Sequence, residues 1–180
     1  LIKLNQFDTI YHEHYSYLSF TFLKNLLTKS KLKAYKIEKL KTHGGSLRVY
    51  VCKNEASLKI ENSIQKTLEE ENNFEINKIK TYKSFQEQAI KIKNNFHEFL
   101  IKEYKAGKKI VAYGAAAKGN TLLNYCGIKK DLIQYVCDIS SSKQNKFLPG
   151  SHIPIVKPEK LIETKPDFVI ILPWNLKKEI

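Results

Sequence analysis

The chain has 180 residues, of which 42% are hydrophobic, enough to build the core of one or two domains. Its formal net charge of +13 comes almost entirely from lysine, since Arg48 is the single arginine among 31 basic residues. Recognition of bases depends on the guanidinium fork and on clustered positive charge, whereas these lysines are scattered. We therefore expect no nucleic-acid partner; salt-sensitive binding of RNA or DNA would support the opposite interpretation.

Three cysteines, at positions 52, 126 and 137, share no Cys-x-x-Cys spacing, which indicates a reducing compartment and no zinc site in this segment. The longest apolar run, residues 168–174, contains a proline and is too short to span a bilayer. No charged-then-apolar signal peptide is present. We predict a cytoplasmic protein without a membrane partner. Because the chain starts at Leu1 and contains no methionine, we expect it to be a piece of a longer polypeptide.

The segment at residues 7–17, Phe-Asp-Thr-Ile-Tyr-His-Glu-His-Tyr-Ser-Tyr, concentrates most of the acid–base capacity of the chain. Histidine titrates near neutral pH, and a neighbouring glutamate can orient or tune it. Residues 7–10 are typical of a short strand, which would place residues 11–14 on the loop at its end, where catalytic groups concentrate. We call residues 11–14 the His-rich loop and predict a functional site there; a surface histidine among core tyrosines is the alternative.

The first 54 residues are interpreted as the end of an α/β domain whose first strands are missing. Ser19 is the predicted N-cap of a helix to about residue 30, and strands are predicted at 34–39 and 46–53 with a Gly44-Gly45 turn between them. Residues 55–106 have the apolar spacing of helices, interrupted by a turn at 69–73 and stopped by Gly107. We predict that this segment is a helical connector.

Residues 107–180 have an alternating strand and helix pattern. A strand at 109–113, a small-residue loop at 114–120 and a helix at 121–126 form the arrangement that binds phosphate through free backbone amides. The next strand, 133–137, ends at an acidic residue that could meet ribose hydroxyls. The candidate ligand-binding residues are Gly114, Ala115, Ala116, Lys118, Gly119, Asn120 and Asp138. A turn that serves only helix–strand packing would give the same pattern, and so would a stand-alone NAD-binding oxidoreductase module.

An extended piece at 153–155, a helix at 158–163 and a buried strand at 167–172 complete the chain. This alternation predicts an α/β fold with a Rossmann-like, mostly parallel sheet, whose ligands bind at the carboxyl ends of the strands. Trp174 follows the last strand and either stacks on a ligand or packs beneath the following helix.

Four blocks in this order resemble one family, the sugar C-methyltransferases that depend on S-adenosylmethionine (SAM). The blocks begin at Phe7 (Phe-Asp-Thr-Ile-Tyr-His-Glu-His), His43 (His-Gly-Gly-Ser-Leu-Arg-Val-Tyr), Tyr113 (Tyr-Gly-Ala-Ala-Ala-Lys-Gly-Asn-Thr) and Ile171 (Ile-Leu-Pro-Trp-Asn). The resemblance implies a zinc-binding N-terminal module, a central SAM-binding domain and a C-terminal Rossmann-like domain that binds the nucleotide sugar. On that basis residues 1–54 end the SAM domain, 55–106 form the connector and 107–180 hold most of the C-terminal domain.

The resemblance also implies a reaction. The family substrate is a nucleotide-diphosphate sugar, expected to be dTDP-linked, whose ketone at C4 acidifies the proton at C3. His14 would remove that proton, Tyr11 would donate a hydrogen bond to the enolate oxygen, and Glu13 would orient the histidine or hold a sugar hydroxyl. The zinc ligands and the glycine-rich SAM loop of the family are absent from this chain, so we expect the fragment alone to be inactive.

Overall fold

The computed structural model describes residues 1–180 and contains two compact units. The first joins Leu1–Glu13 to Gln86–Ile180, and the second is His14–Phe85. The longest helix, α3 (Ile79–Lys105), contributes residues to both units. Neither α3 nor any shorter helix combines the length and the apolar character that a membrane crossing requires.

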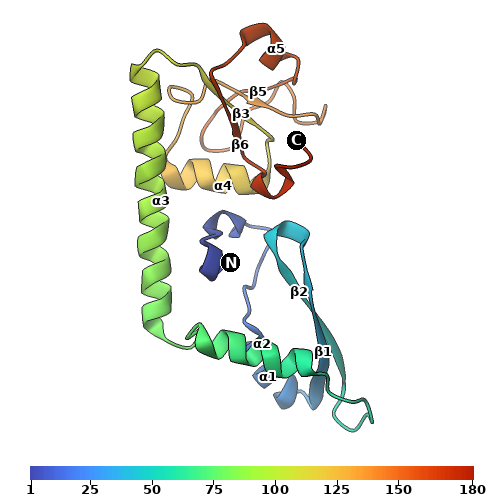
Figure 1. The fold of residues 1–180 in the computed structure, drawn as a ribbon. Coiled ribbons are helices and arrows are strands. Elements are labelled where there is room, and N and C mark those ends of the chain that lie inside the picture. Colours follow the sequence, from blue (N-terminus) through green and yellow to red (C-terminus); the bar gives the residue numbers. More distant parts are fainter. The chain divides into compact units, whose positions relative to one another are not determined.

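The first unit contains a four-stranded, wholly parallel sheet in the order β5-β4-β3-β6, of which Figure 1 labels β3, β5 and β6. Its strands are β3 (Ile110–Tyr113), β4 (Val136–Cys137), β5 (Ile155–Val156) and β6 (Phe168–Ile171). The chain adds strands on one side of β3 and then returns to place β6 on the other side. This topology confirms the predicted α/β, Rossmann-like class, and it puts a reversal of strand order between β3 and β6.

Helices cover both faces of this sheet because β3 alternates its side chains between two apolar clusters. Ile110 and Ala112 face the larger cluster, which includes Leu100 of α3 and Leu123 of α4 (Ala117–Cys126). Val111 faces the smaller cluster, against which Leu161 of α5 (Lys160–Thr164) packs. Two covered faces explain why the strands read as continuous apolar runs.

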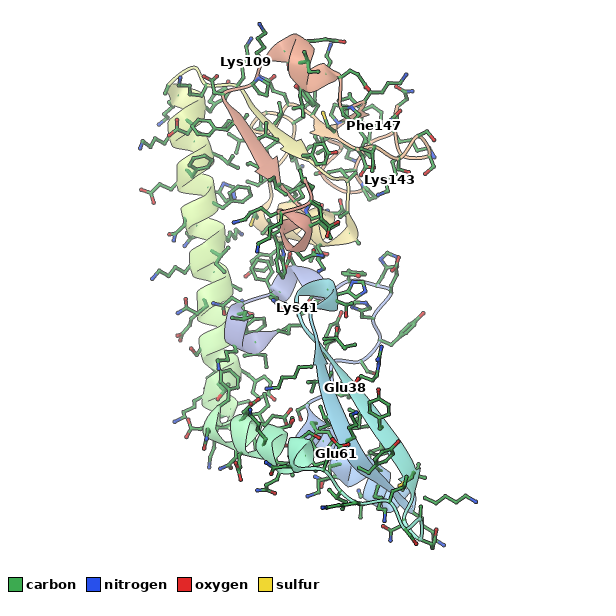
Figure 2. The ribbon with its side chains drawn as sticks, turned by 45° about the vertical axis from the view of Figure 1, so that its right-hand side comes forward. Glu38, Lys41, Glu61, Lys109, Lys143 and Phe147 are labelled. Atoms are coloured by element: carbon green, nitrogen blue, oxygen red, sulfur yellow. The ribbon has the colours of Figure 1, made fainter.

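The second unit is built on an antiparallel hairpin, β1 (Leu32–Leu40) with β2 (Ser46–Lys53). Two helices, α1 (Phe20–Lys29) and α2 (Asn62–Asn73), pack on the hairpin. Their shared core is Phe20, Leu27, Ala34, Ile37 and Ile64. Glu38, labelled in Figure 2, accepts a 2.9 Å hydrogen bond from the Tyr50 hydroxyl across the two strands.

The structure corrects three local predictions. Residues 7–10 are no strand: η2 (Phe7–Thr9) is a 3-10 turn in which the Thr9 hydroxyl donates to the Gln6 carbonyl at 2.7 Å. Helix α4 begins at Ala117 rather than at residue 121, directly after Ala116, which is extended and serves as the N-cap. Helix α2 continues through the predicted turn at 69–73, and the chain turns after it, where Glu75 adopts a φ of 56°.

The remaining helices and strands lie close to their predicted positions, except that the strand predicted at 133–137 is shorter and covers only Val136–Cys137. Ser19 is the N-cap of α1 and accepts a hydrogen bond from the Phe22 amide at 3.1 Å. The boundaries between the two compact units fall after residues 13 and 85. The predicted domain boundaries fall after residues 54 and 106. The origin of residues 1–54 in a SAM-binding domain stays a prediction.

Candidate functional site

The loop after β3 is held against the ends of the two neighbouring strands. The Gly114 amide donates to the Cys137 carbonyl of β4 at 2.7 Å. A Cβ on Gly114, whose φ is +87°, would lie 2.5 Å from Cδ of Pro173, which follows β6. Glycine is therefore required here for two reasons, the left-handed backbone and the close approach of the proline ring.

Asp138, the acidic residue after β4, fastens this loop from the other side. Its carboxylate accepts from the Ala115 amide at 2.7 Å and from the Ser140 amide at 2.8 Å. Lys143, labelled in Figure 2, donates to the Ala115 carbonyl at 3.0 Å and lies 3.4 Å from the Asp138 carboxylate. The carboxylate thus fixes the loop, and the ribose contact expected for Asp138 stays a prediction.

Helix α4 opens directly after the loop, with Ala116 as an N-cap that offers no side-chain hydrogen bond. The first-turn amides of an α-helix have no acceptor within the helix, so this end can bind an anion. Gly119 in the same turn packs on the residue after β6: an added Cβ would lie 2.5 Å from Cβ of Leu172. Asn120 follows, and its side-chain oxygen is buried without a hydrogen-bond partner.

Lys118 is only 7% exposed, which is unusual for a lysine. Its ammonium lies 4.9 Å from the centre of the Trp174 ring and donates to the Asn175 side chain at 3.3 Å. The indole N–H of Trp174 donates in turn to the Asp8 carboxylate at 2.6 Å. These four side chains, from α4, η4 (Trp174–Leu176) and η2, form what we call the Asp8 cluster.

The two charged groups of the Asp8 cluster have shifted pKa values. Burial raises the pKa of Asp8 above its usual value, and the Trp174 hydrogen bond and the Lys118 charge oppose that rise. Burial also lowers the pKa of Lys118, against the effect of the Asp8 charge. Both shifts come mainly from loss of solvent, as expected for ionisable groups inside a packed junction.

The His-rich loop is, in contrast, mostly exposed to solvent. His12, Glu13 and His14 are exposed and Tyr11 is half-buried. The Tyr11 ring contacts the His12 ring edge-to-face at 6.5 Å between centroids, and His14 contacts Tyr17 at 5.9 Å. Tyr11 and Glu13 belong to the first compact unit and His14 to the second. The catalytic roles expected of these three residues stay predictions.

The structure also adds residues that the sequence did not single out. The six candidate residues of the loop and the following helix gather with Asp138, the seventh, at the carboxyl ends of β3 and β4. Asp8, Lys143 and Asn175 join them through contacts with residues distant in sequence. No local pattern marks these three positions, because their neighbours are set by the order of the strands.

Comparison with known proteins identifies the family of this chain. Residues 41–180 match the family described as C-methyltransferase C-terminal domain. The chain is also 35% identical over 180 residues to the C-methyltransferase NovU of Streptomyces niveus, a match that covers 100% of this chain and 43% of that relative. The chain therefore spans less than half the length of the relative. The family match extends over most of the chain and includes the whole parallel sheet, so the chain belongs to the C-methyltransferase C-terminal domain family.

Proposed function

We propose that this chain is the C-terminal part of a SAM-dependent C-methyltransferase that methylates C3 of a nucleotide-linked 4-keto-deoxysugar. One observation carries the proposal. The loop after β3 and the segment after β6 meet where the strand order of the parallel sheet reverses, as the approach of Gly114 to Pro173 demonstrates. Open α/β sheets bind their ligands at such a reversal, outside the carboxyl ends of the strands.

The nucleotide end of the substrate has a chemically suitable neighbourhood here. A diphosphate needs hydrogen-bond donors and positive charge, and the first turn of α4 offers backbone amides and contains Lys118. Lys143 lies on the β4 side of the same loop, through its bond to the Ala115 carbonyl. The net charge of +13 adds a field that favours an anionic ligand.

The chemistry at the sugar calls for one base and one hydrogen-bond donor. In the proposed reaction His14 takes the C3 proton, and the electron pair moves into an enolate stabilised by the C4 oxygen. Tyr11 donates to that oxygen as negative charge develops, and Glu13 orients the base or holds a sugar hydroxyl. The exposure of His14 and Glu13 supports the assignment because these side chains can reach a ligand from solvent.

The loop after β3 is the only candidate phosphate-binding loop that the sequence of this chain offers, and it is assigned here to the sugar nucleotide. The glycine-rich SAM loop that the family resemblance implies is not found among residues 1–180. We therefore infer that SAM, which supplies an electrophilic methyl group when bound, is held by residues of the enzyme outside this chain. We likewise propose a cytoplasmic enzyme whose zinc module lies elsewhere in the polypeptide.

Hydrogen exchange tests the proposed base without requiring the methyl donor. The full-length enzyme, given its 4-keto sugar nucleotide in deuterated water without SAM, should exchange the C3 hydrogen for deuterium. The variant His14→Asn should suppress this exchange while nucleotide binding stays close to wild type. The variant Tyr11→Phe should slow exchange by about 10²–10³-fold, because it removes one donor to a developing oxyanion. Proton NMR of the sugar gives both rates.

The matched control is His12→Asn, which removes a histidine from the same loop. It should exchange at close to the wild-type rate. Wild-type exchange in His14→Asn would instead contradict the proposed base. Hydride transfer to or from a nicotinamide, in place of exchange, would favour the oxidoreductase alternative.

A further inference from the structure

Asp8 is a buried carboxylate on a turn that carries no other charge. Only 7% of the residue is exposed. The turn itself, η2, packs on α4 (Figure 1), where the Phe7 ring meets the Tyr125 ring at 4.8 Å between centroids. Phe7 already supplies apolar packing for this turn. Burial of a carboxylate beside it costs free energy unless the carboxylate has partners, so those partners identify what Asp8 does.

The partners of Asp8 come from both sides of the strand reversal. Trp174, in the segment after β6, donates its indole N–H to Oδ2 of Asp8 at 2.6 Å. Lys118, in the first turn of α4, interacts with the Asp8 charge and lies over the Trp174 ring at 4.9 Å. One carboxylate is therefore linked to both segments that border the expected nucleotide site.

Asp8 lies close in sequence to the His-rich loop, so the contacts that fix Asp8 also constrain that loop. Asp8 precedes Tyr11 by three residues, and both belong to the same compact unit. The Ile10 amide closes η2 by donating to the Phe7 carbonyl at 3.0 Å, so little slack separates Asp8 from Tyr11. A bond that fixes Asp8 also limits where the chain can place the Tyr11 phenol.

We propose that Asp8 is a positioning residue: its bond to Trp174 holds the start of the His-rich loop at a fixed place relative to the nucleotide-binding segments. This inference rests on the proposed function, because it assigns Asp8 to the alignment of Tyr11 with a sugar whose nucleotide lies near Lys118. Alignment of this kind affects catalysis more than binding. A misplacement of about 1 Å can cost about 10²-fold in rate.

A double-mutant cycle in the full-length enzyme tests the proposal. Asp8→Ala and Trp174→Phe each remove the same hydrogen bond, from its two ends. Each variant should lower kcat by about 10–10²-fold while KM for the sugar nucleotide changes less than about threefold. The double variant should be no slower than the slower single variant, because the bond can be lost only once. Asp8→Asn keeps an acceptor oxygen and should recover most of the lost rate.

Three results would overturn the positioning role. They are an unchanged kcat in Asp8→Ala, losses that multiply in the double variant, and losses that match the fraction of unfolded protein in a thermal melt. Trp174→Phe keeps an aromatic ring of similar shape, so the test remains valid even if Asp8→Ala fails to fold. The hydrogen-exchange experiment tests the proposed function independently. Wild-type exchange at C3 in His14→Asn would reject His14 as the base, whatever the Asp8 variants show. Loss of exchange in His14→Asn with a wild-type kcat in Asp8→Ala would reject the positioning role alone.

Discussion

The loop after β3 and the His-rich loop are both candidate ligand sites, but their surroundings differ. In the first, Ala115, Lys118 and Asp138 are buried and each makes defined bonds within the chain. In the second, Glu13 and His14 are exposed to solvent. The structure of the first loop is thus fixed by its own packing, whereas the second presents side chains outward. Substitutions should therefore affect stability at one loop and activity at the other.

The largest expected effect on stability is at Gly114. Gly114→Ala must place a Cβ in a left-handed conformation and against the Pro173 ring, where 2.5 Å separates it from Cδ. The left-handed backbone costs about 1–2 kcal/mol and the overpacking about 1–3 kcal/mol. We expect a loss of about 2–5 kcal/mol in the free energy of unfolding, measured by urea denaturation of the full-length enzyme.

Gly107, at the end of α3, is the matched control for this substitution. It also has a positive φ, +74°, but an added Cβ would meet nothing within 4 Å. Gly107→Ala should cost only the backbone contribution, about 1–2 kcal/mol. Equal losses of stability at the two glycines would show that the contact with Pro173 is unimportant. The loop after β3 would then not be more tightly packed than the His-rich loop.

A smaller loss is expected at Asp138. Asp138→Ala leaves the amides of Ala115 and Ser140 without their acceptor and the Lys143 ammonium without its carboxylate. A buried donor left unsatisfied costs about 1–3 kcal/mol, and solvent can reach part of this site through Lys143, so we expect about 2–3 kcal/mol. Urea denaturation measures the loss. An Asp138→Ala enzyme that stays fully stable but no longer binds the sugar nucleotide would instead return Asp138 to the ribose role.

Local sequence patterns predicted most helices and strands because the physical causes were local. The Ser19 cap, the stop of α3 before Gly107 and the left-handed Gly127 after α4 each depend on residues within one turn. Contacts between residues distant in sequence were not predicted from these patterns. A second cap of α1 comes from Glu71, which accepts from the Phe20 and Thr21 amides at 2.7 Å across about 50 residues of sequence.

The candidate site divides in the same way. The small-residue loop between β3 and α4 was predictable because glycine and alanine at fixed spacing reflect a tight turn and a close strand contact. The Asp8 cluster was not predictable, since Asp8 and Trp174 are separated by 166 positions and meet only through the topology. The strand predicted at residues 7–10 was wrong for the same reason: η2 is buried against α4 rather than paired in a sheet.

The smallest expected effect on stability is at Glu13 in the His-rich loop. Its side chain is exposed, and surface substitutions without special contacts usually change stability by less than about 0.5 kcal/mol. Glu13→Gln should therefore unfold at the same urea concentration as the wild type. Its C3 exchange should be slower, because a neutral amide makes a weaker hydrogen bond to a histidine or a sugar hydroxyl than a carboxylate does. Tyr15, which is 96% exposed two residues later, provides the control, and Tyr15→Ser should change neither property. If Glu13→Gln lost stability as Asp138→Ala does, the His-rich loop would be a packed element as well, and its exposed side chains would no longer argue for a ligand.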